Sequence, residues 1–263
     1  MTAAKLNKTP VLLTFDLDGE VSTRMAAKVN EPGIADPEMG SYGPRQGYLN
    51  ILKLLDRYAI KAAFQIVGKI AEMYPDTIRA IHQAGHELAI HSYTHRDYQT
   101  LSYEEIDEEL GSTQALIKEL TGVTAKGHRS PFWRQSPHLP ALLAKHGIVW
   151  NSDAHIKYEV KDFLKPYYFS ENILELPSSE CLDDWTCLLT RKLPQQEVIA
   201  LWQEKLAACR QQGVPFVLVM HPFIIGQPLF LPVLEAMLEI IKSQADNFVL
   251  LCPQELVREN LSW

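Results

Sequence analysis

Short apolar segments alternate with longer amphipathic segments along almost the whole chain of 263 residues. The short segments have the length and the Val, Ile, Leu and Phe content of buried strands, whereas the longer ones repeat apolar residues at helical spacing. This alternation predicts an α/β fold in which crossover helices join parallel strands, arranged as a barrel or a wound sheet. We expect strands over residues 11–15, 62–67, 87–90, 127–129, 149–152, 173–176, 216–220 and 248–251.

Helices are expected in most of the intervals between these strands. The clearest covers residues 102–120, because Ser102 can cap its first turn and Glu105 follows three residues later. Residues 33–44, rich in Gly and Pro, are expected to form a long surface loop. No linker or repeat divides the chain, so residues 1–263 are predicted to form a single domain that begins with a flexible segment over residues 1–10. The remaining helices are expected over residues 47–58, 75–84, 138–145, 197–212 and 232–243.

Polar side chains suited to catalysis follow several of the predicted strands at the point where each strand ends. The carboxyl ends of parallel barrel strands gather on one face, where such enzymes carry out their chemistry. We therefore expect these residues to converge although they are far apart in the sequence. They are Asp16 and Asp18 after the first strand, His91 after the third, Arg129 at the end of the fourth, and His221 after residues 216–220.

Asp18, His91 and His95 have the composition of a catalytic metal site. One carboxylate and two imidazoles form a three-ligand set that leaves a divalent metal ion open to water. If residues 91–95 were helical, the two histidines would lie on one face. Asp16 would then remain available as a base. The set predicts a metal-dependent hydrolase; the alternatives are a polar turn after the first strand and hydrogen-bonded core histidines.

The run from Asp16 to Gly19 also resembles the nucleophile motif of haloacid-dehalogenase-like phosphotransferases, in which the first Asp attacks phosphorus. Glu20 stands where that motif has Thr or Val. No later Gly-Asp-x-x-x-Asp is present to hold magnesium, and Asp183 with Asp184 is only a faint substitute. A phosphotransferase is therefore a minor alternative.

Two further segments have both a structural and a catalytic interpretation. The segment from Arg129 to Trp133 could be a loop with packed aromatic rings. In the catalytic interpretation Arg129 pairs with Asp16 and keeps it ionised, and the backbone N–H near Phe132 stabilises an oxyanion. His221 follows a very apolar strand and is either a core histidine or a catalyst. The other candidate catalytic residues at strand ends favour the catalytic interpretation.

Composition restricts the partners and the compartment. The net charge of −7 comes without a basic stripe, so neither nucleic acid nor an anionic membrane surface is an expected partner. The apolar segments are too short to span a bilayer, and residues 1–10 lack the apolar core of a signal peptide, so a cytoplasmic location is expected. The cysteines form no Cys-x-x-Cys pair and are expected to be buried, reduced thiols.

Four short motifs in order resemble those of the polysaccharide deacetylase family (carbohydrate esterase family 4): residues 14–19, 91–95, 129–132 and 220–221. The resemblance implies a distorted (β/α) barrel of about seven parallel strands and a divalent metal, most commonly zinc. It implies that Asp18, His91 and His95 are metal ligands, that Asp16 is the general base, that His221 is the general acid for the leaving nitrogen, and that Arg129 orients Asp16.

One residue, Leu17, separates the two acids where the family usually has adjacent aspartates. This variant is similar to a branch that includes peptidoglycan-deacetylase-like proteins, allantoinase-like proteins and cyclic imide hydrolases. Traits shared with that branch are Arg45, residues 151–153, residues 175–177 and residues 182–185. The roles of Asp153, Asp183 and Asp184 are left open by the sequence.

The resemblance implies a carbon–nitrogen bond hydrolase that does not act on peptide bonds. The expected substrates are a small or sugar amide, with ring opening of a cyclic imide or ureide as the alternative, and a homo-oligomer is compatible with either. A catalytically silent carbohydrate-binding protein is the non-enzymatic alternative. The residues expected to contact the substrate are Phe132, Trp133, Asp184, Trp185 and Arg45.

Overall fold

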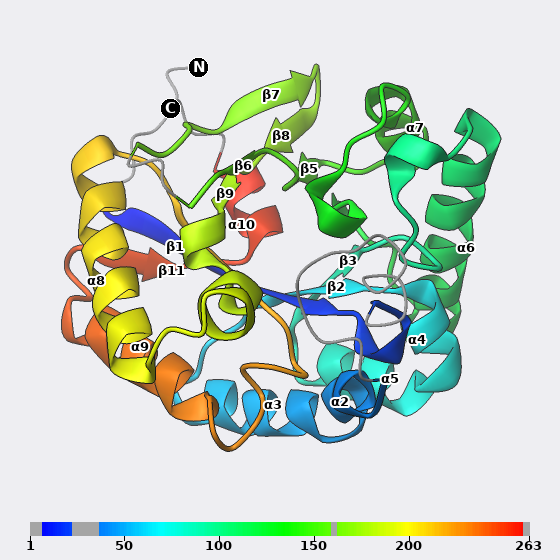
Figure 1. Cartoon of the computed structure of the whole chain (residues 1–263). Coiled ribbons are helices and arrows are strands. Elements are labelled where there is room, and N and C mark those ends of the chain that lie inside the picture. The colour runs from blue at the N-terminus through cyan, green and yellow to red at the C-terminus, as the bar shows by residue number, and fades with distance from the viewer. Residues whose placement is uncertain (1–6, 23–36, 159–161, 260–263) are drawn as a thin grey trace.

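The structure is a computed structural model that describes residues 7–22, 37–158 and 162–259. A curled sheet lies at its centre (Figure 1), with the strand order β10-β1-β2-β3-β4-β5-β8-β7. All neighbours from β10 to β8 are parallel, and only β7 runs antiparallel to β8. The strands are β1 (Thr9–Leu17), β2 (Ala63–Ile66), β3 (Glu87–Ile90), β4 (Gly127–His128), β5 (Trp150–Asn151), β7 (Tyr167–Ser170), β8 (Ile173–Glu175) and β10 (Phe216–Met220).

The sheet curls without closing by a continuous hydrogen-bonded ladder. β6 (His155–Ile156) and β9 (Ser178–Ser179) form a separate parallel pair. The chain after β9 then makes one isolated parallel bridge, between Asp183 and Val219 of β10. β11 (Phe248–Leu250) pairs with the start of β1. The described strands therefore form a half-barrel, which confirms the α/β barrel-like fold expected from the sequence.

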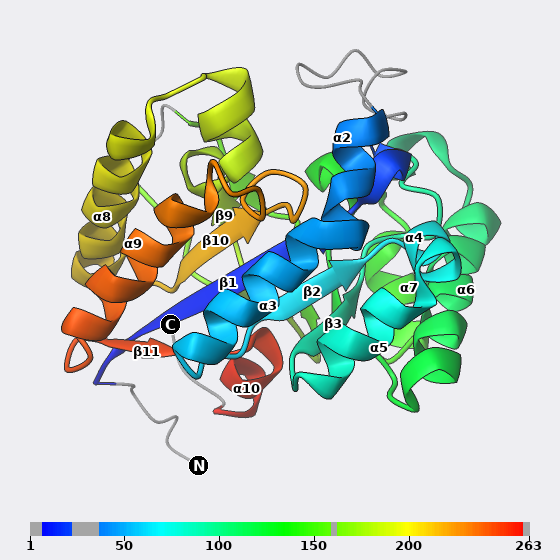
Figure 2. The same ribbon diagram turned by 90° about the horizontal axis from the view of Figure 1, so that it is seen from below.

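Helices cover the outer face of this sheet (Figure 1). Viewed from below, α3 lies between α9 and α5 along the strands β1 and β2 (Figure 2). Short 3-10 or π-helical turns connect other elements: η1 (Gly43–Gly47), η2 (Tyr98–Thr100), η3 (Pro131–Trp133), η4 (Glu180–Leu182) and η5 (Trp185–Thr190). The helices are α2 (Pro37–Tyr42), α3 (Tyr48–Arg57), α4 (Gly68–Met73), α5 (Pro75–Gln83), α6 (Tyr103–Thr121), α7 (Leu139–Lys145), α8 (Gln195–Gln212), α9 (Leu231–Ser243) and α10 (Pro253–Arg258).

The alternation of side chains along the strands divides the molecule into two apolar regions. Phe15 and its odd-numbered neighbours in β1 pack against the helices in the main core. Leu12 points to the other side, into a smaller cluster inside the half-barrel. Trp150 fills this interior, where a Cβ on Gly127 would lie 1.9 Å from its ring. The inner faces of the strands thus carry an apolar floor, and the polar residues at the strand ends lie above it.

Most predicted elements are present, and the differences have local causes. All eight predicted strands exist, and their ends lie within two residues of the expected bounds. Three strands were not predicted: β6 and β9 have two residues each, and β7 is a partly exposed edge strand. The six-residue helices α4 and α10 were also missed, because each is too short to show a helical repeat.

The loop predicted over residues 33–44 is wrong for its described part. Residues 33–36 lie outside the described residues, whereas residues 37–42 form α2 and the chain continues into the π-helical turn η1 (Gly43–Gly47). The glycines here serve close packing: a Cβ on Gly47 would lie 2.0 Å from the carbonyl oxygen of Pro222. A composition typical of loops thus belongs to a helical segment packed tightly against another backbone.

The flexible segment predicted over residues 1–10 is wrong for its last two residues. Thr9 and Pro10 are buried at the start of β1, where they pair with Phe248 and Val249. Residues 1–6 lie outside the described residues. The single-domain organisation of residues 1–263 stays a prediction.

Two expectations from composition can be compared with the structure. The four cysteines, Cys181, Cys187, Cys209 and Cys252, are buried free thiols, as predicted. Among the described residues, every helix is too short or too polar to cross a lipid bilayer.

Candidate functional site

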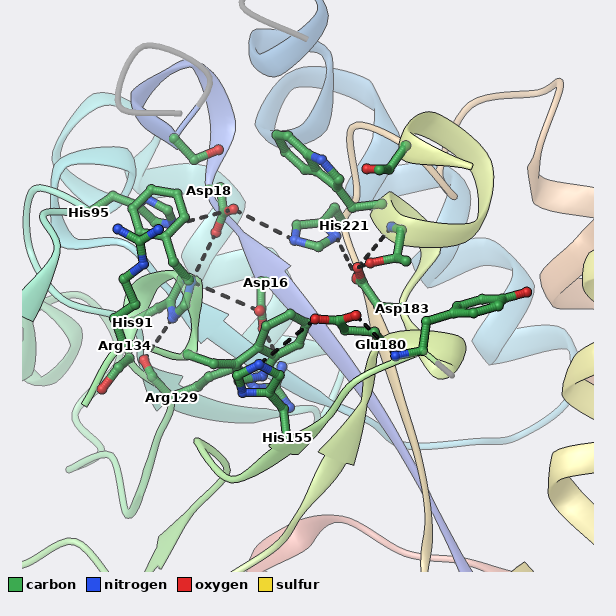
Figure 3. A pocket seen from close by; sticks show the side chains of 18 of the residues that line it. Asp16, Asp18, His91, His95, Arg129, Arg134, His155, Glu180, Asp183 and His221 are labelled. Atoms are coloured by element: carbon green, nitrogen blue, oxygen red, sulfur yellow. Dashed lines mark hydrogen bonds and ion pairs between the residues drawn. The ribbon is translucent and has the colours of Figure 1, made fainter. Parts of the chain in front are cut away.

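A cavity of about 530 Å³ lies at the carboxyl ends of the strands and contains the polar residues singled out in the sequence. Figure 3 shows that they reach it from separate elements. Asp16 belongs to β1, and Asp18 follows that strand directly. His91 follows β3, and His221 follows β10. The convergence expected for parallel strands is therefore present.

Asp18 lies between the two histidines with which it was grouped (Figure 3). Its Oδ1 is 3.4 Å from His91 Nε2, and its Oδ2 is 3.5 Å from His95 Nε2. All three side chains are buried, and Asp18 Oδ1 accepts no hydrogen bond from the described residues. Two ligands placed tetrahedrally about 2.0–2.1 Å from a zinc ion would be about 3.3 Å apart. The donor atoms thus have a spacing that fits a divalent metal ion.

The hydrogen bond of His91 also suits a metal ligand. Its Nδ1 lies 2.7 Å from the backbone carbonyl oxygen of Arg129, which can only accept, so Nδ1 carries the proton. The lone pair of the neutral ring is then on Nε2, which faces Asp18. Burial lowers the pKa of His91 and favours this neutral form. The strand ends therefore orient the imidazole for coordination.

The segment from His91 to His95 is a turn and not the helix considered above. Two residues in it have left-handed backbone angles, Ser92 with φ 61° and His95 with φ 56°. The side chain of Ser92 accepts a hydrogen bond of 2.8 Å from the backbone N–H of His95. The two imidazoles converge because this turn folds the chain back on itself, and the i, i+4 geometry of a helix has no part in it.

Arg129 contacts Asp16 as the sequence predicted. Its Nη1 donates a 2.6 Å hydrogen bond to Asp16 Oδ1, and the guanidinium is completely buried. Further hydrogen bonds go to Thr14 and to the backbone and hydroxyl oxygens of Ser152. A planar guanidinium held on three sides gives Asp16 one orientation. The other oxygen of Asp16, Oδ2, faces His91 Nε2 at 3.9 Å.

His221 lies on the side of Asp18 that is opposite His91 and His95 (Figure 3), with its Nε2 3.8 Å from Asp18 Oδ2. Its Nδ1 donates a 2.7 Å hydrogen bond to Asp184 Oδ1, and its backbone N–H donates to Asp184 Oδ2. Burial alone would lower the pKa of His221, but the carboxylates of Asp184, Asp18 and Asp183, with Asp184 contributing most, together raise that pKa to about 10. The ring is therefore kept as a proton donor with Nε2 directed toward the cavity.

Asp184 was expected to contact the substrate, and its position corrects that expectation. The side chain is fully buried behind His221 and does not line the cavity. Its neighbour Asp183 does line it, while accepting hydrogen bonds from the N–H and hydroxyl of Thr186. The adjacent acids point to different sides because they lie in an extended-to-helical junction before η5 (Trp185–Thr190). Sequence position alone did not distinguish them.

The other residues expected at the substrate fall into two groups. Phe132, Trp133 and Trp185 line the cavity. Arg45 does not: it is exposed in η1, with its guanidinium carbon 5.9 Å from the centre of the Tyr74 ring. This position does not support a direct contact with a substrate in the described cavity.

Several cavity residues were not identified from the sequence. His155 was not among the residues singled out from the sequence, but it lines the cavity and stacks on Trp133 with ring centres 5.0 Å apart. The missed residues lie on segments without a recognisable motif, so no local signal could have identified them. The other charged and aromatic residues that were missed are Arg134, Lys157, Tyr158, Glu180 and Arg191.

Asp153 lies outside the cavity wall and holds the loop that follows β4. Its carboxylate accepts hydrogen bonds from the backbone N–H and the hydroxyl of Ser130, at 2.5 and 2.7 Å. The next residues, Phe132 and Trp133, have left-handed φ angles of 58° and 53°. Asp153 therefore fixes the start of a strained loop that borders the cavity.

The contact between Asp184 and His221 leads to a testable prediction. Asp184→Asn is expected to lower kcat by about 10–100-fold and to move the alkaline limb of the kcat profile to lower pH. The reason is that an acid must be protonated: activity is present below the pKa of His221, about 10, and is lost as pH rises through it. Without the carboxylate of Asp184, the pKa of His221 is lower and activity is lost at a lower pH. The measurement is kcat against pH.

The matched control is Asp107→Asn, which removes the negative charge from an equally short contact, 2.7 Å to His146 Nε2, outside the cavity. It is expected to leave the pH profile unchanged. An unshifted alkaline limb in Asp184→Asn would show that Asp184 does not set the protonation of His221.

A parallel half-barrel with buried acids and imidazoles at the carboxyl ends of its strands defines the class of barrel enzymes with a strand-end active site. A family model described as polysaccharide deacetylase matches residues 40–150, a segment that contains His91, His95 and Arg129. The chain is thus similar to the polysaccharide deacetylase family over this segment, and the relatives below extend the similarity. Members of this family are hydrolases that act on N-acetyl amide bonds.

The similar proteins cover the rest of the chain. The peptidoglycan deacetylase of Helicobacter pylori is 26% identical over 196 residues, which are 66% of this chain and 67% of that protein. A putative polysaccharide deacetylase from Mycobacterium smegmatis has a solved structure that is 26% identical, covers 100% of this chain and 96% of its own, and has a TM-score of 0.83. The structure of Puue allantoinase is 21% identical, covers 95% and 89%, and has a TM-score of 0.77, which shows a shared fold.

Proposed function

We propose that this protein is a metal-dependent hydrolase that removes an acyl group from the nitrogen of a small or sugar amide. The observation that carries the proposal is the arrangement around Asp18: two imidazole nitrogens 3.4 and 3.5 Å from its carboxylate, with Asp16 and His221 on either side. We assign Asp18, His91 and His95 as the metal ligands. Zinc is the metal that best suits two imidazoles and one carboxylate.

The chain supplies the groups that amide hydrolysis requires around such an ion. When bound, the ion would supply Lewis-acid activation of the attacking water and of the carbonyl group. Asp16, held by Arg129, takes the proton from the attacking water. His221 donates a proton from Nε2 to the leaving nitrogen, which would otherwise leave as a poor, strongly basic anion. The backbone N–H of Phe132 is the group that we assign to the developing negative charge on oxygen.

The aromatic side chains in the cavity support a cyclic substrate. Trp133 and Trp185 both line its wall. Such rings stack on the apolar face of a sugar or on a flat heterocycle. Cavity volume and lining thus agree with an N-acyl sugar, which is also the type of substrate that the family's name suggests.

Ring opening of a cyclic ureide or imide is the second candidate. It is favoured by the fold shared with Puue allantoinase over 95% of the chain. Deacylation and ring opening both hydrolyse a carbon–nitrogen bond with the same catalytic groups. They differ in the leaving nitrogen, which stays attached to the product in a ring opening. Similarity to the deacetylase family is evidence against the phosphotransferase and against the silent carbohydrate-binding protein. The cytoplasmic location and the oligomeric state stay predictions.

A substrate panel tests the proposed function. N-acetylglucosamine oligomers, allantoin, succinimide and hydantoin would be incubated with the protein, with and without a chelator, while acetate release and ring opening are measured separately. We expect acetate release that stops with chelator and returns with zinc. Ring opening without acetate release would favour the second candidate. Turnover that is indifferent to chelator would contradict metal dependence for either.

A further inference from the structure

His91 and His95 are held in different ways. The ring of His91 is oriented by its hydrogen bond to the carbonyl oxygen of Arg129, across two neighbouring strands. His95 Nδ1 is buried and has no hydrogen-bond partner among the described residues. The edge of its ring contacts Phe132, with centres 4.8 Å apart. The direction of His95 Nε2 therefore depends on the backbone of the turn that carries it.

That turn needs external support because its backbone is strained and polar. Ser92 and His95 have left-handed φ angles, which residues with a Cβ rarely adopt. The N–H groups of Tyr93 and Thr94 are not used by a helix or a strand. Backbone donors in a buried turn must find acceptors elsewhere. The structure supplies one acceptor group for both.

Glu109, on the inward face of α6, is that acceptor. Its Oε2 accepts hydrogen bonds of 2.6 Å from the N–H of Tyr93 and 2.7 Å from the N–H of Thr94. Its Oε1 accepts from the hydroxyl of Thr94 at 2.5 Å and from Arg96 at 3.0 and 3.1 Å. One carboxylate thus receives five hydrogen bonds from three residues that flank His95.

The carboxylate of Glu109 is buried and depends on these hydrogen bonds. The residue is 3% exposed, and a buried carboxylate is tolerated only where donors surround it. The same helix adds a second support, because the hydroxyl of Thr113 donates to the carbonyl oxygen of Ser92. Glu108, one residue earlier, is exposed and makes none of these contacts with the turn.

We propose that Glu109 is a positioning residue of the metal centre, which sets the orientation of His95 through residues 93–96 without touching the metal. The proposal rests on the proposed function, because it takes His95 as a ligand. In other metal sites, groups that do not touch the metal orient the side chains that bind it, and Glu109 would have this role for His95. Helix α6 thereby contributes to a site that otherwise comes from strand ends.

Glu109→Gln is the sharpest test because it changes the shape of the side chain least. The amide has one acceptor oxygen, and its NH2 group would face donors that it cannot accept from. We expect the zinc dissociation constant, measured by competition with a chelator of known affinity, to rise by about 10–100-fold. We expect kcat at saturating zinc to recover most of the wild-type value. The matched control is Glu108→Gln, with wild-type zinc affinity expected.

Thermal unfolding of the metal-free proteins separates positioning from general support of the fold. A lower melting temperature of metal-free Glu109→Gln with unchanged zinc affinity would overturn the proposal. A wild-type protein that binds no zinc would overturn the proposed metal site and this role of Glu109 with it, so the two failures are distinguishable. Thr94→Val is a milder second variant: it removes one of the five hydrogen bonds and is expected to weaken zinc binding by a smaller factor.

Discussion

His91→Ala is expected to abolish metal binding and hydrolysis together. His91 Nε2 is 3.4 Å from Asp18 Oδ1, and its Nδ1 proton is committed to the carbonyl oxygen of Arg129, so it is the most strongly oriented of the three assigned ligands. Removing it leaves two ligands, too few to hold zinc firmly at a catalytic site. We expect zinc to fall below stoichiometric levels after dialysis and kcat/KM to fall by about 10³-fold or more. Elemental analysis and steady-state kinetics on the same preparation measure both.

The control for this prediction is His138→Ala. His138 is exposed and precedes α7, where its ring contacts only Tyr103 among the described aromatic residues. This variant should keep its zinc and its activity. If His91→Ala retained zinc at the wild-type ratio, the ligand assignment would be wrong even if activity were lost.

Asp16→Asn is expected to separate metal binding from catalysis. The amide keeps the size of the side chain and can still accept the hydrogen bond from Arg129, but it cannot take a proton from the attacking water. Because Asp16 is not one of the assigned ligands, zinc content should remain close to that of the wild type. We expect kcat to fall by about 10³–10⁴-fold, the upper range for loss of a positioned base.

Asp246→Asn is a suitable control, since Asp246 is exposed between α9 and β11, away from the cavity. It should change neither zinc content nor kcat. Should Asp16→Asn lose zinc together with activity, Asp16 would have to be counted among the ligands and another group would have to act as the base.

The sequence predicted well which polar residues converge, because the ends of parallel strands place them. Asp16 and His221 each follow a short apolar run, and a parallel sheet brings such ends to one edge whatever the loops do. The ion pair of Arg129 with Asp16 was predicted for the same reason. His91 and His95 were grouped correctly, although the helix that would have aligned them is a strained turn.

The sequence predicted the surroundings of the catalytic set less well. Asp184 was assigned to the substrate, yet it is buried behind His221. His155 was not singled out from the sequence, yet it stacks on Trp133 in the cavity wall. Glu109 was one acid among many on an amphipathic helix. None of these residues directly follows one of the predicted strands, so the residues that each one contacts depend on how distant segments pack together.

The alternation of strands and helices and the period of two along each strand are local properties, and the amino-acid sequence alone determined them. These properties placed Asp16, Asp18, His91, Arg129 and His221 at one edge of a curled sheet. Only the tertiary structure decided which oxygen faces which nitrogen: the carbonyl oxygen of Arg129 on His91, the carboxylate of Asp184 on His221, and Glu109 beneath the turn of His95. The physical reason is that such contacts join segments far apart in the chain, and their geometry depends on the packing of every element between them.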